Sequence, residues 1–224
     1  DAVQAVGKIP LNLSKSAIDL LTLSGHKLHA PKGVGALFIR KGITFTPFVV
    51  GGHQEKNRRG GTENVPSIIG LGRACELAKK YMSEEQILVK QLRDKVEDEI
   101  LEKAPDVRVN GHKTKRLPNT TNLSFEFVEG EAILLLLNER GICASSGSAC
   151  TSGSLEPSHV LRAMGVPFTA VHGSVRLSLS RYNTIEAVDY IVEHLPPIIR
   201  RVREISPYGR ETRVKGRFDK VSAR

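Results

Sequence analysis

The stretch Leu20-Leu21-Thr22-Leu23-Ser24-Gly25-His26-Lys27 passes from apolar residues to a polar end that carries a lysine. A second apolar stretch, Gly35-Ala36-Leu37-Phe38-Ile39-Arg40, follows the turn at Pro31-Lys32-Gly33. Short apolar stretches bounded by turn residues are typical of β-strands. We therefore predict two neighbouring strands, with Lys27 just beyond the end of the first.

Two helices are predicted after the Gly-rich, basic loop that runs from Gly51 to Thr62. Pro66 is suited to the first turn of a helix that reaches about Met82. Ser83, with Gln86 three residues later, forms a capping-box pattern that predicts a second helix and a domain boundary near that point. One face of this second helix is predicted to pack against the core through residues spaced four apart, namely Leu88, Leu92, Val96 and Ile100.

Strands and helices alternate through the rest of the chain. Strands are predicted over 107–109, 122–128, 142–145 and 174–180, and helices over 131–140, about 157–164 and from 183 onward. In the strand 122–128, Leu123, Phe125 and Phe127 share one face. Pro196-Pro197 is expected to interrupt or kink the last helix. This order predicts an α/β or α+β fold without an internal repeat.

The composition is that of an ordinary globular protein. The 224 residues are 40% hydrophobic and 25% charged, enough for one large or two modest domains. No apolar run approaches the ~18 residues of a membrane span, and no signal peptide opens the chain. Three widely spaced cysteines, an odd number, argue against a disulfide framework. We therefore expect a cytoplasmic, reducing location and no membrane partner.

The net charge of +9 does not by itself predict a nucleic-acid partner. The basic residues are scattered, aromatic residues make up only 5%, and no nucleic-acid-binding motif is present. The one concentrated stretch, Gly209 to Arg224, carries six Lys and Arg against two acidic residues. It is expected to be a solvated basic tail, or else a surface for an acidic protein partner.

Lys27 is a candidate Schiff-base nucleophile, a role that requires a partly desolvated amine. A strand end can aim such a lysine into a cleft, although these four residues alone favour an ordinary exposed loop lysine. Asp1 precedes Lys27 by 26 residues, a separation compatible with a carboxylate that holds the proton on a pyridoxal ring nitrogen. Taken alone, Asp1 carries no such meaning.

Cys150 lies in Ala144-Ser145-Ser146-Gly147-Ser148-Ala149-Cys150-Thr151-Ser152-Gly153-Ser154-Leu155-Glu156-Pro157, a stretch with few apolar side chains. An accessible thiolate in such a loop suits sulfur transfer between a cleft and an outside acceptor. A Ser/Gly linker with an incidental cysteine explains the stretch equally well. Cys75 and Cys143 lie in a predicted amphipathic helix and an apolar strand, so we expect both in the core.

Arg176 lies on a predicted strand whose apolar residues, Val175, Leu177 and Leu179, face the other way. An arginine that projects from a sheet can bind a carboxylate through two parallel hydrogen bonds. In isolation, however, a solvated charge at a strand edge is the simpler explanation.

Together these segments resemble the NifS/IscS-type cysteine desulfurases, within the class V aminotransferase group of fold-type I pyridoxal enzymes. The motifs that carry the resemblance are Ser24-Gly25-His26-Lys27, Gly60-Gly61-Thr62-Glu63-Asn64 and the run from Ser145 to Pro157. Gly51-Gly52-His53-Gln54-Glu55 and Ala144-Ser145-Ser146-Gly147 bring the chain closest to the NifS group. The resemblance covers residues 1 to about 208.

The resemblance implies a role for each matching residue. Pyridoxal 5'-phosphate is the implied cofactor, bound covalently by Lys27. Asp1 pairs with its ring nitrogen and Gln4 with its phenolic oxygen. The remaining implied roles are phosphate binding by Ser24 and His26, phosphate binding in the partner subunit by Thr62, substrate carboxylate binding by Arg176, and sulfur acceptance by Cys150.

The implied reaction removes sulfur from L-cysteine, giving L-alanine and a persulfide on Cys150. A homodimer is implied, with an iron–sulfur scaffold protein as the sulfur acceptor, in nitrogenase cluster assembly. No intrinsic metal site is implied, although Cys150 would transiently ligate a nascent cluster. The implied domains are the remainder of a large cofactor-binding domain over 1–82, a small C-terminal α+β domain over 83–206, and the basic tail over 207–224.

The resemblance also implies that a similar length of chain precedes the position of Asp1 in the family. That part supplies a phosphate-binding turn, a histidine stacked on the ring and a substrate-binding asparagine, so we expect this chain to be inactive alone. Two other function classes remain open at this point. One is a class V aminotransferase or selenocysteine lyase, and the other is a non-catalytic sulfur-carrier fragment.

Overall fold

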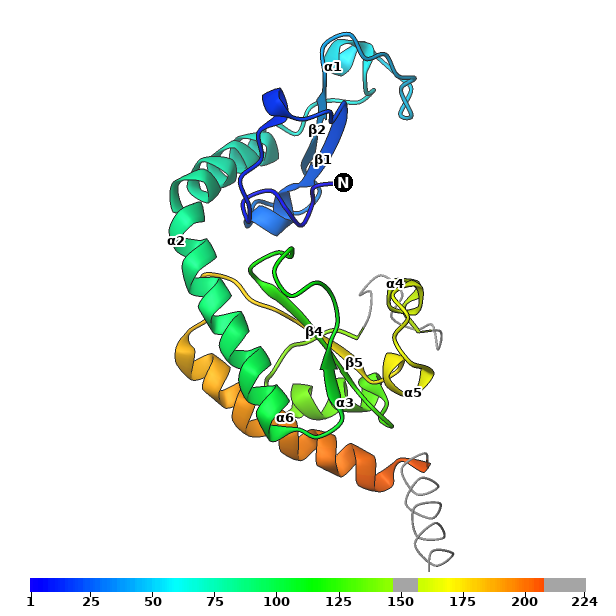
Figure 1. Cartoon of the computed structure of the whole chain (residues 1–224). Coiled ribbons are helices and arrows are strands. Elements are labelled where there is room, and N and C mark those ends of the chain that lie inside the picture. The colour runs from blue at the N-terminus through cyan, green and yellow to red at the C-terminus, as the bar shows by residue number, and fades with distance from the viewer. Residues whose placement is uncertain (147–156, 208–224) are drawn as a thin grey trace, which may run out of the picture. The chain divides into compact units, whose positions relative to one another are not determined.

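The computed structural model describes residues 1–146 and 157–207 (Figure 1). The chain divides into two compact units, Asp1–Gln86 (unit 1) and Ile87–Arg224 (unit 2). One helix, α2 (Val65–Lys103), contributes residues to both units. The mixture of helices and strands confirms the predicted α/β class.

Unit 1 contains an antiparallel pair of strands, β1 (Leu20–Ser24) and β2 (Gly35–Ile39), as predicted. Its helical segments are η1 (Leu13–Lys15), η2 (Gly25–Leu28), the four-residue α1 (Gln54–Asn57) and the first part of α2. Only a few apolar side chains of this unit are buried, among them Leu21, Leu28 and Leu71. Leu20 and Leu37 remain nearly half exposed.

The predicted break between two helices at Ser83 is wrong, because α2 continues from Val65 to Lys103 (Figure 1). No glycine or proline occurs between Arg73 and Lys103, so nothing in this stretch opposes helix propagation. Gln86 does not cap a helix start. Its side-chain amide instead donates to the carbonyl oxygen of Lys8 at 2.7 Å, and the neighbouring Glu85 forms an ion pair with Lys8.

Unit 2 is built on an antiparallel three-stranded sheet in the order β3-β4-β5. The strands are β3 (Val107–Val109), β4 (Thr120–Phe125) and β5 (Ser174–Ser178), and the helices that follow α2 are α3 (Gly130–Glu139), α4 (His159–Ala163), α5 (Phe168–Val171) and α6 (Ile185–Ile205). The predicted strand over 142–145 is wrong, since only Ser145 pairs, in an isolated bridge with Arg176. The strand predicted to reach residue 128 ends at Phe125, and Phe127 has a left-handed φ of 62°.

The core of unit 2 lies on one face of this sheet. Alternate residues of β4 and β5, Leu123, Phe125, Val175 and Leu177, are buried there. Helix α2 adds Val89, Leu92, Val96 and Ile100 to the same core. Leu88 was also predicted to pack against this core, and that prediction is wrong. The Leu88 residue is 42% exposed, whereas Val89 is 1% exposed. The buried row therefore begins one residue later than the four-residue spacing suggests.

Helix α6 is not interrupted at Pro196-Pro197, contrary to that part of the prediction. A proline inside a helix costs about 3 kcal/mol or more. Val188, Leu195 and Ile199, each fully buried, lie on both sides of the proline pair. Burial of each such side chain contributes roughly 1.5–3 kcal/mol, which offsets the cost of the prolines.

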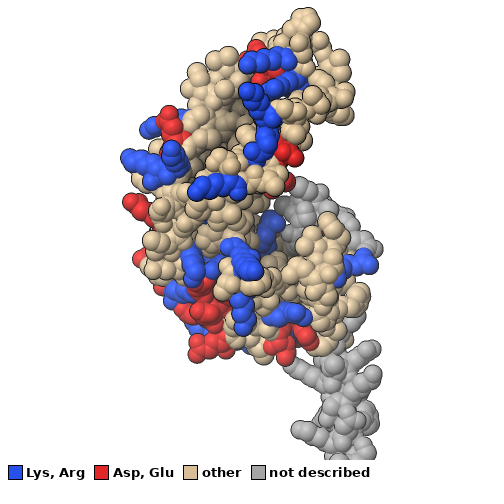
Figure 2. All heavy atoms as spheres, turned by 45° about the horizontal axis from the view of Figure 1, so that its top comes forward, with Lys and Arg blue, Asp and Glu red and all other residues tan. Residues whose placement is uncertain are grey.

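One face of the molecule is mixed in charge. On the face drawn in Figure 2, acidic side chains occur beside basic ones. Within residues 1–146 and 157–207, no helix is long and apolar enough to cross a membrane. Residues 208–224, nearly all of the predicted basic tail, lie outside the described part.

Candidate active site

Lys27 lies in η2, three residues beyond the end of β1, as the sequence predicts. Gly25 permits the close approach of Val34, because a Cβ atom on Gly25 would lie 2.8 Å from Cγ1 of Val34. His29, with a left-handed φ of 64°, ends the turn. The Lys27 side chain is exposed, so these residues do not supply the desolvation that a Schiff-base lysine requires.

Other predicted cofactor-binding residues lie around the same strand. The Ser24 hydroxyl is 2.8 Å from Nδ1 of His26. Asp1 is tied to β1 through its Oδ1 atom, which accepts from the Thr22 hydroxyl at 3.3 Å and from the Val3 amide at 2.8 Å. The backbone reinforces this contact, since the Ala2 amide donates to the Thr22 carbonyl at 3.0 Å.

The remaining polar atoms of this group are available to a ligand. Oδ2 of Asp1 and the Lys27 ammonium form no hydrogen bond with another described residue. Gln4 is exposed in the turn that follows Asp1. A carboxylate, a hydroxyl, an imidazole and an amine are the groups that a phosphorylated pyridine aldehyde requires. The chemistry of these residues therefore fits pyridoxal phosphate.

Thr62 lies in a strained loop of unit 1 and is exposed. The loop is closed where the Gly60 amide donates to the Val49 carbonyl at 2.8 Å. A Cβ atom on Gly60 would lie 2.8 Å from the Gly51 backbone, so only glycine permits this approach.

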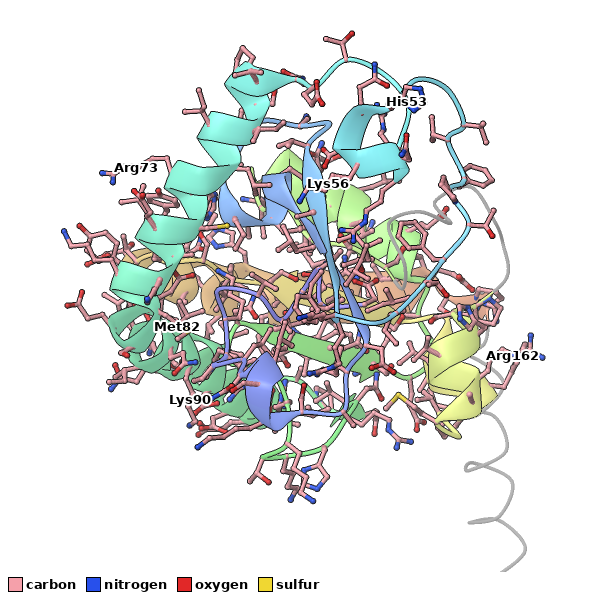
Figure 3. All side chains as sticks on the ribbon, turned by 90° about the horizontal axis from the view of Figure 1, so that it is seen from above. His53, Lys56, Arg73, Met82, Lys90 and Arg162 are labelled. Atoms are coloured by element: carbon pink, nitrogen blue, oxygen red, sulfur yellow. The ribbon has the colours of Figure 1, made fainter. Side chains whose placement is uncertain are left out.

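The strain of this loop is concentrated in α1. Glu55, Lys56 and Asn57 all have left-handed φ values, between 49° and 63°. Each such residue costs roughly 1–2 kcal/mol. His53 opens the segment, with Nδ1 2.6 Å from Oδ1 of Asn57 (Figure 3, which labels His53 and Lys56). Strain of this kind is typical of segments that contact a ligand or a partner.

Arg176 lies on β5 and is half-buried, whereas its neighbours Val175 and Leu177 are buried on the opposite face. The predicted alternation is therefore confirmed. Asn122 of β4 lies directly opposite Arg176. On the other side of β5, the backbones of Arg176 and Ser145 exchange two hydrogen bonds, of 2.6 and 3.1 Å. Arg176 is thus anchored beside the segment that leads to residue 150.

Cys150 itself lies outside the described residues. The two described cysteines, Cys75 and Cys143, were both predicted to lie in the core, and neither is fully buried. Cys143 is exposed, so that prediction is wrong, because residues 142–144 do not pair as a strand. Cys75 is only half-buried, on α2. Burial raises the pKa of the Cys75 thiol above its ordinary value.

These surroundings predict different thiol reactivities. The thiolate is the reactive form, and a raised pKa lowers its population at pH 8. We expect Cys143 to react with iodoacetamide at least about ten times faster than Cys75. Peptide mass spectrometry of the full-length protein over a time course measures both rates, with urea-unfolded protein as the control in which they converge. Equal rates in the folded protein would contradict the assigned exposures.

The structure thus gathers Asp1, Ser24, His26 and Lys27 around β1 in unit 1, and places Arg176 in the sheet of unit 2. Sequence reasoning missed two residues on the Arg176 face, Asn110 and Asn122. For Asn122 the available signal was an asparagine inside a strand, where this residue type is uncommon. Among the described residues, no three His, Cys, Asp or Glu side chains gather as metal ligands.

Comparison with curated proteins identifies close relatives. "Cysteine desulfurase 2" of Trichormus variabilis is 62% identical over 211 residues, which are 94% of this chain and 53% of the relative. "Cysteine desulfurase NifS" of Azotobacter vinelandii is 60% identical over 208 residues, which are 93% of this chain and 52% of the relative. The chain therefore spans about half the length of the curated relatives it matches.

Solved structures show the same fold. A "NifS-like protein" superposes with a TM-score of 0.80 at 38% identity, over 89% of this chain and 51% of that chain. A NifS-like protein from Rickettsia africae gives a TM-score of 0.80 at 36% identity, over 88% of this chain and 52% of that chain. The pattern of the family described as aminotransferase class-V matches residues 1–191. The chain belongs to the class-V aminotransferase family.

Proposed function

We propose that the whole protein is a pyridoxal-phosphate-dependent cysteine desulfurase, which converts L-cysteine to L-alanine and leaves the sulfur as a persulfide on Cys150. The names of relatives at 60–62% identity support this activity. The observation that carries the proposal is the group of residues around β1: Lys27 just beyond the strand end, the Ser24–His26 pair, and Asp1 tied to Thr22.

Each residue of this group has a proposed role toward the cofactor. Pyridoxal phosphate, when bound, would accept the electron pair released at the substrate Cα. Lys27 would hold it covalently, Asp1 would keep its ring nitrogen protonated through the free Oδ2, and Gln4 would bond its phenolic oxygen. Ser24 and His26 would bind its phosphate. Residues beyond this chain would cover Lys27, which the described residues leave exposed.

Three residues of this chain would then act on the substrate. Arg176 would bind the carboxylate of L-cysteine, whose amine would take the place of Lys27 on the cofactor. The Lys27 amine, freed by this exchange, would take the proton from Cα. The Cys150 thiolate attacks the substrate sulfur: the new S–S bond forms, the Cβ–S bond breaks, and its electron pair is protonated at Cβ. The products are L-alanine and a Cys150 persulfide, so the sulfur is transferred without an external oxidant.

The acceptor of this sulfur would be a scaffold protein that assembles iron–sulfur clusters. The name of the Azotobacter vinelandii relative favours a role in nitrogenase cluster assembly. The few, widely spaced cysteines support a reducing, cytoplasmic location. For the domains, we propose that 1–82 completes a large cofactor-binding domain, that 83–206 forms a small domain, and that 207–224 is a basic tail.

We also propose that the active protein is a homodimer, in which Thr62 reaches the cofactor phosphate of the partner subunit. The strained, glycine-closed loop before Thr62 supports this role, because such a conformation persists where a ligand or a partner is contacted. Sedimentation of the full-length protein should show an active dimer, and Thr62→Ala should raise the dissociation constant of the cofactor about tenfold. An active monomer would contradict the proposal.

Product analysis of the full-length protein tests the activity. With pyridoxal phosphate and L-cysteine, we expect alanine and sulfide in equal amounts when dithiothreitol releases the sulfur. An aminotransferase would instead form a keto acid, because it removes the amino group of the substrate and leaves the Cβ–S bond intact, a reaction that needs no thiol. Keto acid without alanine would favour that alternative, and the absence of any cofactor-dependent product would favour a non-catalytic sulfur carrier.

A further inference from the structure

A hollow of about 540 Å³ lies between helices α2 and α6 of unit 2. The two helices run side by side in the same direction (Figure 1), and an ion pair of 3.0 Å joins Lys95 to Asp189. Its volume lies within the ~300–1,000 Å³ of typical ligand sites. The residues of its walls that carry a charge or lack a backbone amide hydrogen include Glu99, Lys103, Glu193, Pro196, Pro197 and Arg200.

The proline pair of α6 frees backbone acceptors on one wall of this hollow. In a regular α-helix each carbonyl accepts from the amide four residues later, and proline has no amide hydrogen. The carbonyls of Val192 and Glu193 therefore lack this donor, because Pro196 and Pro197 follow them by four residues. Val192 is buried, whereas Glu193 and Pro197 are exposed. The Glu193 carbonyl is thus the acceptor that a ligand can reach.

The packing of α6 does not require proline at position 197. Pro197 is exposed, so its ring adds little to the core. An alanine there would donate its amide to the Glu193 carbonyl and would keep the helix regular. What the proline changes at this position is that it leaves an open acceptor on the wall of the hollow.

Two charges of opposite sign remain free on the same wall. The exposed side chains of Glu193 and Arg200 form no hydrogen bond or ion pair with another described residue. On the α2 wall, by contrast, Glu99 is already paired, with Lys103 at 2.6 Å and with Lys95. Glu193 and Arg200 are seven residues apart, which is about 10 Å along one face of a helix. The hollow therefore has an acidic end and a basic end.

The acidic end suits an arginine side chain. A guanidinium has five N–H donors in a planar fork, so it can bind the Glu193 carboxylate through two hydrogen bonds and the open Glu193 carbonyl through a third. Its apolar stem can lie along the Pro197 ring. A metal ion is a poorer match, because no three His, Cys, Asp or Glu side chains of the described residues gather as ligands.

The basic end determines what else the ligand must carry. Arg200 binds a carboxylate, and this carboxylate must lie about 10 Å from the guanidinium held at Glu193. A free α-amino acid has its two backbone charges too close together to reach both ends. An extended peptide rises about 3.3 Å per residue, so an arginine and an acidic residue three positions apart span the distance.

We propose that this hollow docks an extended segment of a partner protein, which presents an arginine to Glu193 and an acidic residue, three positions away, to Arg200. Pro197 is a positioning residue in this site, because it keeps the Glu193 carbonyl open. The inference goes beyond the proposed sulfur transfer and does not depend on it.

Binding of a matched pair of peptides to the full-length protein tests the proposal. The peptide Ac-Arg-Ala-Ala-Glu-NH2 carries both charges, and its control has citrulline, the neutral isostere of arginine, in the first position. We expect the dissociation constant of the arginine peptide, measured by calorimetry at low ionic strength, to be at least about tenfold lower, because hydrogen bonds to a charged group are strong. Equal binding of the two peptides, or binding of neither, would overturn the proposal.

Variants at the two charged ends locate the peptide. Glu193→Gln should raise the dissociation constant of the arginine peptide about tenfold and change that of the citrulline peptide less than twofold. Arg200→Gln should weaken binding about fivefold, but not for a peptide in which glutamine replaces the glutamate. Glu204→Gln, an exposed residue of α6 outside the hollow, is the matched control and should bind as the wild type does. Equal losses in Glu193→Gln and Glu204→Gln would contradict the site.

Pro197→Ala separates binding from folding, because the two effects have opposite signs. The new amide donates to the Glu193 carbonyl, so the midpoint of thermal unfolding should rise, while the dissociation constant of the arginine peptide should increase about threefold. Binding equal to that of the wild type, or a fall in both stability and binding, would overturn the role of the open carbonyl.

Discussion

Lys27→Ala is expected to abolish alanine formation from L-cysteine. The Lys27 amine is proposed both to hold the cofactor and to take the proton from the substrate Cα, so a single substitution removes two contributions. General acid–base catalysis alone typically contributes 10²–10⁴-fold, and the loss of the covalent attachment adds to this. Chromatographic measurement of alanine over several hours, with the full-length protein, provides the sensitivity to detect residual turnover.

The variant should remain folded. Lys27 is exposed and forms no side-chain hydrogen bond with another described residue. Exposed substitutions of this kind usually change the free energy of unfolding by less than about 0.5 kcal/mol. Lys32→Ala, an exposed lysine in the turn before β2, is the matched control and should keep full activity.

A chemical readout that does not depend on turnover accompanies this variant. Borohydride treatment fixes a lysine-bound pyridoxal group irreversibly, and peptide mass spectrometry locates it. We expect the label on Lys27 in the wild type and in Lys32→Ala, and none in Lys27→Ala. A fixed pyridoxyl group on another lysine, with turnover retained, would contradict the assignment.

Cys150→Ala is expected to lower the rate of alanine formation at least ~100-fold, or about 3 kcal/mol of activation free energy. The substitution removes the thiolate that attacks the substrate sulfur, and with it the covalent route. Binding of the cofactor and of L-cysteine should be retained, because neither is assigned to Cys150. This separates the effect from that of Lys27→Ala, in which cofactor attachment is lost.

The two described cysteines serve as controls for this variant. Cys143→Ala should keep near-normal turnover, since Cys143 is exposed and has no assigned role. Cys75→Ala should also keep turnover, with a modest loss of stability because its thiol is half-buried on α2. Near-normal alanine formation in Cys150→Ala, or a large loss in Cys143→Ala, would contradict the proposed sulfur acceptor.

The strands were largely predictable because local pattern and burial agree in them. The apolar stretches around Leu21 and Phe38 became β1 and β2, and the alternation around Arg176 became β5. Lys27 could be placed beyond a strand end for the same reason. In these segments the residues that contact the core are also those with a strong local preference for strands.

Two predicted helix boundaries were wrong. In each case a local sequence pattern was outweighed, either by tertiary contacts or by the absence of a helix-breaking residue. The capping-box pattern at Ser83 did not start a helix, because α2 meets no glycine or proline there. Pro196-Pro197 did not end α6, because buried side chains on both sides hold the helix against the core.

The supporting contacts of the site could not be predicted from local patterns. The bond from Thr22 to Asp1 joins residues 21 positions apart. The bond from Asn110 to Asn122 joins residues 12 positions apart and depends on the register of β3 with β4. A one-residue change in that register would move each side chain to the other face. Only the folded sheet therefore reveals that these asparagines share a row with Arg176.

The most direct test of the proposed sulfur transfer is to locate the persulfide. The full-length protein, loaded with pyridoxal phosphate, is mixed with L-cysteine without added thiol, blocked by alkylation and digested for mass spectrometry. We expect one additional sulfur atom on the peptide that contains Cys150, formed together with one molecule of alanine per active site. Sulfur on Cys75 or Cys143, or alanine formed without any protein-bound sulfur, would contradict it.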